Sequence, residues 1–467
     1  MSSYDYDLVV IGSGPAGQKA AIQAAKLDKR VAVVERKAVV GGVCINTGTI
    51  PSKTLREAVI YLSGYRHHNI YGKSYKVKDR ITAEDLMFRI EHVVRHEIDV
   101  IRDQLLRNGI DVLNAEASFI EPHTLRLNFV DGSAEREIAA ANTVIATGTK
   151  ATQHEHIPFD GKNVLTSDDI LELDEIPRTL TVVGAGVIGL EYASMFAALD
   201  VRVTLVDKRE RLLPFIDEEI IDTLIYHLRQ NRVTLHLGEE VTGIECLDDP
   251  HQSVRINLKS GKKIRSEKAL YSIGRTGATD SLKLENAGLD TVKHQLLDVN
   301  ENYQTSVAHI YAVGDVIGFP SLASTSMEQG RLASCHAFGV ETKSIPELFP
   351  YGIYSVPEIS TVGRNEEELT SDGVPYEIGK AQYQEIARGQ IIGDNFGTLK
   401  LLFHLETKQL LGVHIIGEGA SELVHIGQAV MAFGGTVDYF VNTVFNYPTL
   451  AECYKTAALD GLNRLAM

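Results

Sequence analysis

The segment GGVCINTGTIPSK (residues 41–53) contains a side chain that could act as a nucleophile, the thiol of Cys44. A thiol–disulfide relay would need a second sulfur about 2 Å from the first. The residue five positions after Cys44 is Thr49, whose hydroxyl cannot form a disulfide. Cys44 therefore cannot cycle through a disulfide with that neighbour, and the four cysteines of the chain are too scattered to form a disulfide framework or a CxxC metal site.

A glycine-rich turn near the start of the chain predicts a dinucleotide site. Gly12, Gly14 and Gly17 form GxGxxG directly after an apolar strand, and Glu35 ends the next strand. The first glycine permits a tight turn, the second lets a pyrophosphate approach the backbone, and the third lets the helix pack closely. The helix N-terminus favours phosphate, and Glu35 is placed to accept hydrogen bonds from a ribose.

A second copy of this motif follows about 170 residues later. Gly184, Gly186 and Gly189 again follow a strand, and Asp207 ends the next one. Two such sites indicate two bound dinucleotides, the arrangement of an enzyme that passes electrons between them.

The residues after Asp207 leave the choice of coenzyme open. An acid at this position favours NAD, because it holds the 2′-hydroxyl and repels a 2′-phosphate. Lys208, Arg209 and Arg211 follow at once, and they could hold a 2′-phosphate if Asp207 turned aside. They could equally be solvated charges at the end of a strand.

The elements that would position these residues are parallel βαβ units. Short β-branched runs precede each glycine turn and alanine-rich runs follow it. Helix-favouring sequence covers residues 55–107, and residues 123–150 predict a hairpin with an Asp-Gly turn. From about Pro346 strands and then helices predict a further domain.

Composition excludes several classes of protein. The 467 residues are enough for about three domains, and the net charge of -16 disfavours nucleic acid or an anionic membrane as partner. No apolar run reaches the length of a membrane-spanning helix, and the N-terminus lacks a secretory signal, so we expect a cytoplasmic protein. The scattered histidines lack metal-ligand spacing, and no metal is expected.

The motifs VVIGSGPAG, GGVCINTGTIPSK, VVGAGVIGLE, IYAVGD and FNYPTLAE occur in the order found in the pyridine nucleotide–disulfide oxidoreductases, and the chain resembles that family over essentially its whole length. The resemblance implies an α/β fold with two Rossmann-like dinucleotide-binding domains, for FAD and for NAD(P), and a C-terminal α+β dimerisation domain. It implies a homodimer, with further assembly left open. The expected segments are 1–150 and 275–345 for the FAD domain, 151–274 for the NAD(P) domain and 346–467 for the interface domain.

The same resemblance implies roles for individual residues. Gly12, Gly14, Gly17 and Glu35 would bind the ADP half of FAD, and Asp315 would hold its ribityl chain. Lys53 would lie near flavin N5 and pair with Glu191, which would approach the nicotinamide; these two are the expected catalytic residues. Further cofactor contacts are expected at Gly42, Cys44, Thr49, Lys53, Thr147, Gly148, Gly184, Gly186, Gly189, Asp207, Lys208, Arg209, Gly274 and Gly314.

Two departures from the family pattern concern the same reaction. Thr49 stands where the disulfide reductases have their flavin-side cysteine, and Tyr447 stands where they have an acid–base histidine, although Glu452 is kept. Tyrosine, with an ordinary pKa near 10, shuttles protons poorly at neutral pH. The chain thereby resembles the soluble pyridine nucleotide transhydrogenases. This implies transfer of hydride from NADPH to NAD⁺, reversibly, by a ping-pong reaction through flavin N5 without a redox-active disulfide.

Three alternatives remain open at this point. Cys44 and Cys453 could approach each other across a dimer and retain thiol chemistry, as in a dihydrolipoamide dehydrogenase-like enzyme. Reduced flavin could serve a quinone or dye instead of NAD⁺. A non-catalytic nucleotide sensor is disfavoured by the intact Lys53 and Glu191. The sequence does not give the direction of hydride transfer, the preferred coenzyme, or any effector.

Overall fold

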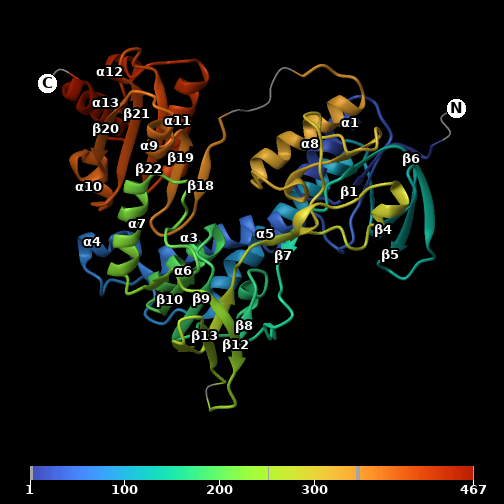
Figure 1. The fold of residues 1–467 in the computed structure, drawn as a ribbon, viewed down its shortest axis with the longest axis horizontal. Coiled ribbons are helices and arrows are strands. Elements are labelled where there is room, and N and C mark those ends of the chain that lie inside the picture. The colour runs from blue at the N-terminus through green and yellow to red at the C-terminus, as the bar shows by residue number, and fades with distance from the viewer. Residues whose placement is uncertain (1–3, 251, 343–347, 466–467) are drawn as a thin grey trace. The chain divides into compact units, whose positions relative to one another are not determined.

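The computed structural model describes residues 4–250, 252–342 and 348–465 (Figure 1). The chain forms two compact units, each assembled from three separate stretches. Unit 1 comprises Met1–Thr54, Met87–Thr152 and Gly274–Ile345, and unit 2 comprises Leu55–Leu86, Gln153–Ile273 and Pro346–Met467.

The main sheet of unit 1 is a parallel sheet extended by antiparallel strands. Its strands lie in the order β3-β2-β1-β6-β5-β4, and β17 pairs with β6 in parallel. The expected hairpin is confirmed as β5 and β6, which pair antiparallel around the Asp-Gly turn. The strands are β1 (Tyr6–Ile11), β2 (Val31–Val34), β3 (Asp111–Leu113), β4 (Ala115–Glu121), β5 (Thr124–Phe129), β6 (Arg136–Ile145) and β17 (Ile310–Ala312), with a small pair β7 (Thr149–Ala151) and β16 (Arg275–Gly277) beside them.

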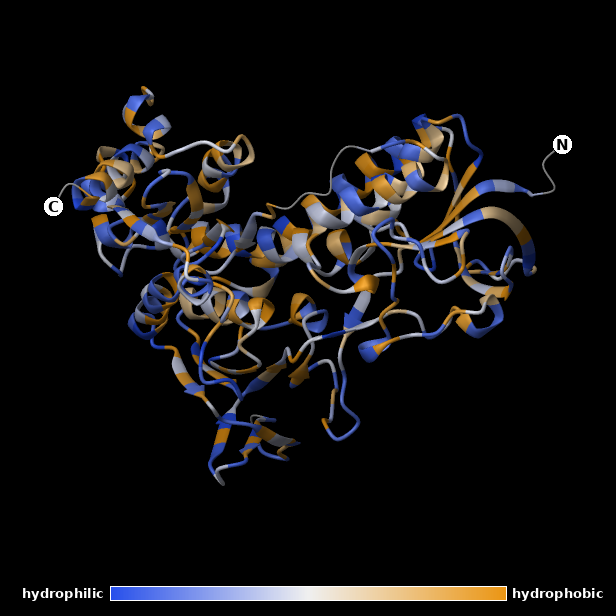
Figure 2. Cartoon of the chain, turned by 45° about the horizontal axis from the view of Figure 1, so that its top comes forward, coloured by the Kyte–Doolittle hydropathy of each residue, from blue (hydrophilic) through white to orange (hydrophobic). Residues whose placement is uncertain are grey.

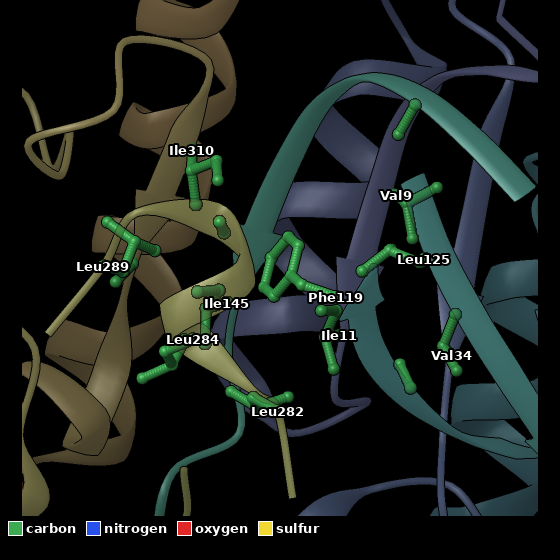
Figure 3. Packing of buried hydrophobic residues seen from close by; sticks show 14 of the residues in the cluster. Val9, Ile11, Val34, Phe119, Leu125, Ile145, Leu282, Leu284, Leu289 and Ile310 are labelled. Atoms are coloured by element: carbon green, nitrogen blue, oxygen red, sulfur yellow. The ribbon is translucent and has the colours of Figure 1, made fainter. Parts of the chain in front are cut away.

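Both faces of the parallel part of this sheet are buried, which explains the apolar sequences of β2, of β17 and of the second half of β1. In β1, Val9 and Ile11 point into one hydrophobic cluster, whereas Leu8 and Val10 point into another. Such alternation into two cores is expected of a parallel sheet covered on both sides. Figure 3 shows the first cluster, with the ring of Phe119 at its centre.

Helices of unit 1 cover the sheet and pack closely on one another. Gly330 in α8 lies so near α1 that an added Cβ would meet the carbonyl oxygen of Ala16 at 2.0 Å. The hydroxyl of Ser334 donates to the carbonyl oxygen of Ala20 at 2.7 Å. The helices are α1 (Pro15–Ala25), α2 (Gly42–Asn46) and α8 (Ala323–Ala337); α3 (Thr49–Ser63) and α5 (Ala83–Arg107) contribute residues to both units.

The described residues of unit 2 form three sheets. The parallel sheet has the order β11-β10-β9-β15-β8, and the C-terminal sheet is antiparallel in the order β18-β19-β22-β21-β20. A three-stranded antiparallel sheet, β12-β13-β14, lies in sequence between β11 and β15 of the parallel sheet. The strands are β8 (Val164–Leu165), β9 (Thr179–Val183), β10 (Arg202–Asp207), β11 (Thr234–Leu237), β12 (Val241–Cys246), β13 (Val254–Leu258), β14 (Lys263–Ser266), β15 (Lys268–Tyr271), β18 (Tyr351–Ile353), β19 (Ile359–Gly363), β20 (Tyr376–Gln382), β21 (Thr398–His404) and β22 (Leu410–Ile416).

The helices of unit 2 belong partly to the parallel sheet and partly to the C-terminal sheet. They are α4 (His68–Tyr71), α6 (Val187–Ala198), α7 (Glu218–Gln230), α9 (Glu366–Ser371), α10 (Ala387–Ile392), α11 (Ala420–Ala432), α12 (Asp438–Asn442) and α13 (Glu452–Leu465). The predicted fold class, two Rossmann-like parallel sheets with a C-terminal α+β domain, is confirmed.

Helices across the chain carry hydrophobic and hydrophilic stretches side by side (Figure 2). This pattern is expected of helices that bury one face against a sheet. Among the described residues, none of the helices combines the length and the apolar character needed to cross a bilayer.

A buried lysine links three elements of unit 2. Lys400 in β21 is fully buried, and its ammonium contacts Asp217 Oδ1 at 2.9 Å, Glu219 Oε2 at 3.2 Å, and Glu366. Burial lowers the pKa of Lys400, but the attraction of Asp217 and the hydrogen bonds to Glu366 and Asp217 outweigh it, and the pKa lies above the ordinary lysine value. The three carboxylates are close enough to hold a metal ion, but the ammonium already lies among them.

We predict that Lys400→Met destabilises unit 2 by about 3–5 kcal/mol, because it leaves Asp217 buried without its cation. Lys380→Met is the matched control, since Lys380 is partly exposed and pairs with Glu219 on the surface, where such pairs contribute about 0–1 kcal/mol. Urea unfolding, together with hydrogen exchange of the β21 amides, measures the stability of both variants. Because the folded pKa of Lys400 is raised, its contribution is complete below the ordinary lysine pKa and falls as pH rises beyond it. Equal losses in the two variants would contradict the role given to Lys400.

Candidate functional site

The first glycine turn, between β1 and α1, is formed as the motif predicts. Gly12 has φ +105, and a Cβ on it would meet the carbonyl oxygen of Ala146 at 2.4 Å. A Cβ on Gly17 would lie 1.9 Å from the carbonyl oxygen of Gly12, so the helix touches the turn directly. At Gly14 an added Cβ would meet nothing within 4 Å. The turn therefore leaves open space at the position expected for the pyrophosphate, while its other two glycines are required by close packing.

The acid predicted to bind a ribose is held in place by its neighbours. Glu35 is buried, and its Oε2 accepts hydrogen bonds from Ser13 N at 3.0 Å and Ser13 Oγ at 2.6 Å. Ser13 Oγ in turn accepts from Gly41 N at 3.0 Å, and Gln18 Nε2 donates to Ser13 O at 2.7 Å. Ser13 and Gln18 were missed by sequence reasoning, although both lie within the motif. They fix the orientation of the carboxylate that would hold the ribose.

The segment that carries Cys44 lies against the same turn. A Cβ on Gly42 would approach the Cα of Gly14 at 2.8 Å. Cys44 follows in α2, and its sulfur makes a side-chain hydrogen bond with Thr49, the first residue of α3. Burial raises the pKa of the Cys44 thiol, and the bond with Thr49 offsets this only in part. The thiol is thereby kept protonated at neutral pH.

The segment around Asp315 is fixed by contacts that the sequence did not indicate. Gly314 N donates to Gln329 Oε1 at 2.9 Å. Asp315 hydrogen-bonds the side chains of Thr149 and Ser326, and burial raises the pKa of its carboxyl although Arg275 opposes this. Arg275 also donates to Thr149 Oγ1 at 2.7 Å.

The residues of unit 1 fit the FAD that the motifs predict. Gly14 and Gly148 face open space, and Gly148 has φ +65. The hydroxyls of Thr47 and Thr147 are buried without a hydrogen-bond partner, which is costly unless a bound group supplies one. Unit 1 brings together, from distant parts of the chain, the predicted residues Gly12, Gly14, Gly17, Glu35, Gly42, Cys44, Thr49, Lys53, Thr147, Gly148, Gly274, Gly314 and Asp315.

The second glycine turn, between β9 and α6, repeats the geometry of the first. Gly184 has φ +101, and a Cβ there would meet Ser272 O at 2.5 Å. A Cβ on Gly189 would meet Gly184 O at 1.9 Å, whereas a Cβ on Gly186 would meet nothing within 4 Å. This turn in unit 2 has the same open position for a dinucleotide.

Asp207 at the end of β10 is held by the arginine that follows it. Its Oδ2 accepts from Ala185 N at 2.6 Å and Arg209 Nη2 at 2.7 Å, and its Oδ1 accepts from Arg209 N at 2.8 Å and Arg209 Nε at 2.9 Å. Burial raises the pKa of Asp207, but the hydrogen bonds of Arg209 and Ala185 outweigh it, and the pKa is lowered. Lys208 is exposed. Of the three cations predicted near the ribose, Arg209 is the one bonded to the acid.

The two predicted catalytic residues belong to different units. Lys53 lies in α3 within unit 1 and is half-buried. Glu191 lies in α6 within unit 2, is buried, and accepts a hydrogen bond from Tyr354 N at 2.8 Å. Their pairing with each other stays a prediction.

The C-terminal residues that depart from the family pattern lie in unit 2. Tyr447 is 74% exposed in the single chain. Cys453 in α13 is fully buried, and burial raises the pKa of its thiol to about 12. Cys44, Cys246, Cys335 and Cys453 are all free thiols.

Comparison with known proteins identifies the family. Residues 6–330 match the family described as pyridine nucleotide-disulphide oxidoreductase, and residues 349–458 match its dimerisation domain. This chain belongs to the pyridine nucleotide-disulphide oxidoreductase family. It is 55% identical to the soluble pyridine nucleotide transhydrogenase of Mycobacterium bovis over 99% of this chain and 98% of that protein. It is 47% identical to the protein of the same name from Pectobacterium atrosepticum, again over 99% and 98%.

Solved structures of the family have the same fold. LpdA from Mycobacterium tuberculosis superposes with a TM-score of 0.89 at 26% identity, covering 97% of this chain and 99% of that one. The HOCl-induced flavoprotein disulfide reductase RclA from Escherichia coli superposes with a TM-score of 0.86 at 28% identity, with the same coverage. The predictions of an oxidoreductase, of FAD and of nicotinamide dinucleotides are confirmed, and the dimerisation domain supports a homodimer.

We predict different effects for alanine at two glycines of the first turn. Gly17→Ala should destabilise the protein by about 1–3 kcal/mol or more, because the new Cβ would overlap Gly12 O. Gly14→Ala should leave the stability of the FAD-free protein within about 0.5 kcal/mol, because its Cβ meets nothing, yet weaken FAD binding. Denaturant unfolding of FAD-free protein and FAD titration separate the two. A normal FAD affinity for the Gly14 variant would contradict the assignment of this turn as the binding site of the FAD pyrophosphate.

Proposed function

We propose that this chain is a soluble transhydrogenase, which moves a hydride equivalent reversibly between NADPH and NAD⁺ and uses no redox-active disulfide. The observation that carries the proposal is the contact between the Cys44 thiol and the Thr49 hydroxyl. Thr49 occupies the place of a second sulfur, so Cys44 has no disulfide partner in its own segment. Full-length relatives that are 47–55% identical have the name soluble pyridine nucleotide transhydrogenase.

The protonation of the cysteine thiols also supports an enzyme without disulfide exchange. Thiolate, not thiol, is the nucleophile in disulfide exchange. Burial raises the pKa of both Cys44 and Cys453, so neither is a ready thiolate at neutral pH. The exposed Tyr447 stands where the disulfide reductases of the family have a histidine for proton transfer. A relay reaction would lack its second sulfur, its thiolate and its base.

The chain's own residues would supply binding and electrostatics for hydride transfer. When bound, FAD accepts a hydride equivalent from one nicotinamide and returns it to another. Lys53 would place a positive charge beside the flavin, where it stabilises the negative charge that reduction adds. Glu191, fixed by the backbone of Tyr354, would orient the nicotinamide and pair with Lys53. The glycine turns would hold the two pyrophosphates at helix N-termini.

Steady-state kinetics with NADPH and thio-NAD⁺ test this proposal. Since the two nicotinamides would react in turn at one site, double-reciprocal plots at several fixed concentrations of the second substrate should be parallel. Turnover with thio-NAD⁺ should exceed turnover with quinones at matched concentrations. Intersecting lines, or a quinone rate well above the thio-NAD⁺ rate, would show that the chain is a different kind of NAD(P)H oxidoreductase.

We predict that Lys53→Met lowers kcat for this reaction about 100-fold, the scale of one well-placed electrostatic group. Lys26→Met is the matched control, because Lys26 is an exposed lysine at the end of α1. Its kcat should stay within about twofold of the parent protein. If both variants keep full activity, Lys53 has no catalytic role.

A further inference from the structure

The carboxylate of Asp207 is fixed in position. It is 7% exposed and accepts four hydrogen bonds, two of them from the backbone N–H groups of Ala185 and Arg209. Its own backbone carbonyl accepts from Glu239 N at 3.0 Å, which anchors the end of the strand. The sequence left open that Asp207 turns aside to admit a 2′-phosphate. In the structure, main-chain N–H groups donate to both oxygens of Asp207. Arg209, and not Asp207, is therefore the side chain that can move.

The guanidinium of Arg209 is the movable partner of this pair. Its side chain is 42% exposed while that of Asp207 is 6% exposed, and it contributes the other two bonds, through Nε and Nη2. The guanidinium is thus the solvent-facing end of the pair, and it can leave toward solvent while Asp207 keeps its two main-chain hydrogen bonds. The remaining N–H groups of Arg209 are free of Asp207 and are of the kind that bind phosphate.

The other cations nearby are less suited to this task. Arg211 already contacts Glu218 at 3.0 Å and Glu367 at 3.7 Å. Lys208 is exposed and makes no contact with the carboxylate of Asp207. Arg209 is therefore the cation that can both neutralise Asp207 and reach a group bound beside it.

We propose that Asp207 and Arg209 form a two-position selector that lets one site accept both coenzymes. With the pair closed, Arg209 cancels the charge of Asp207 and offers its outer N–H groups to the 2′-phosphate of NADP(H). With the pair open, the guanidinium leaves and the two oxygens of Asp207 accept hydrogen bonds from the ribose hydroxyls of NAD(H). The inference rests on the proposed function, since a transhydrogenase must bind the two coenzymes in turn, and it assigns their discrimination to one side-chain movement.

The test uses FAD-loaded protein and two probes that cannot transfer hydride. ADP-ribose and 2′-phospho-ADP-ribose lack the nicotinamide and differ only in the phosphate, and bound FAD excludes them from the first site. Calorimetric titration measures the affinity of both probes for the parent protein, Arg209→Ala, Asp207→Asn and Lys208→Ala, the last of which tests the competing cation. Circular dichroism and FAD content check folding, and Arg209→Gln replaces Arg209→Ala if the latter loses FAD.

Arg209→Ala should weaken the binding of 2′-phospho-ADP-ribose about 30-fold, which is the effect expected from losing charge-assisted hydrogen bonds. It should leave ADP-ribose unchanged or bound a fewfold more tightly, because no ion pair has to open. Asp207→Asn should have the reverse effect. It should weaken the binding of ADP-ribose about 10-fold and the binding of 2′-phospho-ADP-ribose less than about threefold. Lys208→Ala should change both by less than about threefold.

Two results would overturn the selector. One is an equal loss of both probes in Arg209→Ala, which would make Arg209 a structural residue of the strand end. The other is a larger loss of 2′-phospho-ADP-ribose in Lys208→Ala than in Arg209→Ala. Failure of the proposed function is distinguishable, because it would appear as absent NADPH–thio-NAD⁺ turnover in the parent protein while these binding ratios are unaffected.

Discussion

The two dinucleotide motifs depend on one steric constraint, the direct contact of a helix with the glycine turn before it. In both motifs a Cβ on the third glycine would lie 1.9 Å from the carbonyl oxygen of the first, Gly12 in one case and Gly184 in the other. This contact leaves no room for any other residue at Gly17 and Gly189. It also brings the N-terminus of α1 or α6 to the turn, where its unpaired N–H groups can meet a pyrophosphate. The positions of Glu35 and Asp207 follow, because Glu35 comes directly after β2 and Asp207 ends β10, the strands that pair with β1 and β9.

On this shared fold a few residues decide which chemistry is possible. LpdA and the disulfide reductase RclA have the same fold at 26–28% identity. In this chain the thiol of Cys44 meets the hydroxyl of Thr49, and burial keeps that thiol protonated. The dinucleotide sites keep their glycines and their acids. Under the proposed function the chain keeps the residues for hydride transfer and has lost those for disulfide exchange, so function would be decided at the site and not by the fold.

Much of this arrangement could be predicted from the sequence, because local patterns determine it. The glycine spacings, the acids that follow them and the hairpin around residues 131–132 all depend on residues close together in the chain. Contacts between distant segments could not be predicted. Arg275 with Thr149, and Gln329 with Gly314, join residues that no local pattern connects. The burial of Lys400 beside Asp217 could not be predicted either. From sequence alone a lysine in a strand is expected to be exposed, because the distant carboxylates that pair with it are not known.

The electron capacity of the protein tests the central claim most directly. FAD-loaded protein is titrated anaerobically with dithionite or NADPH while flavin absorbance is recorded. If FAD is the sole redox centre, two electrons per FAD bleach the yellow colour completely and no long-wavelength thiolate–flavin band appears. Uptake of four electrons before the colour is lost, or the appearance of that band, would show that a sulfur couple operates beyond the flavin and would contradict the account.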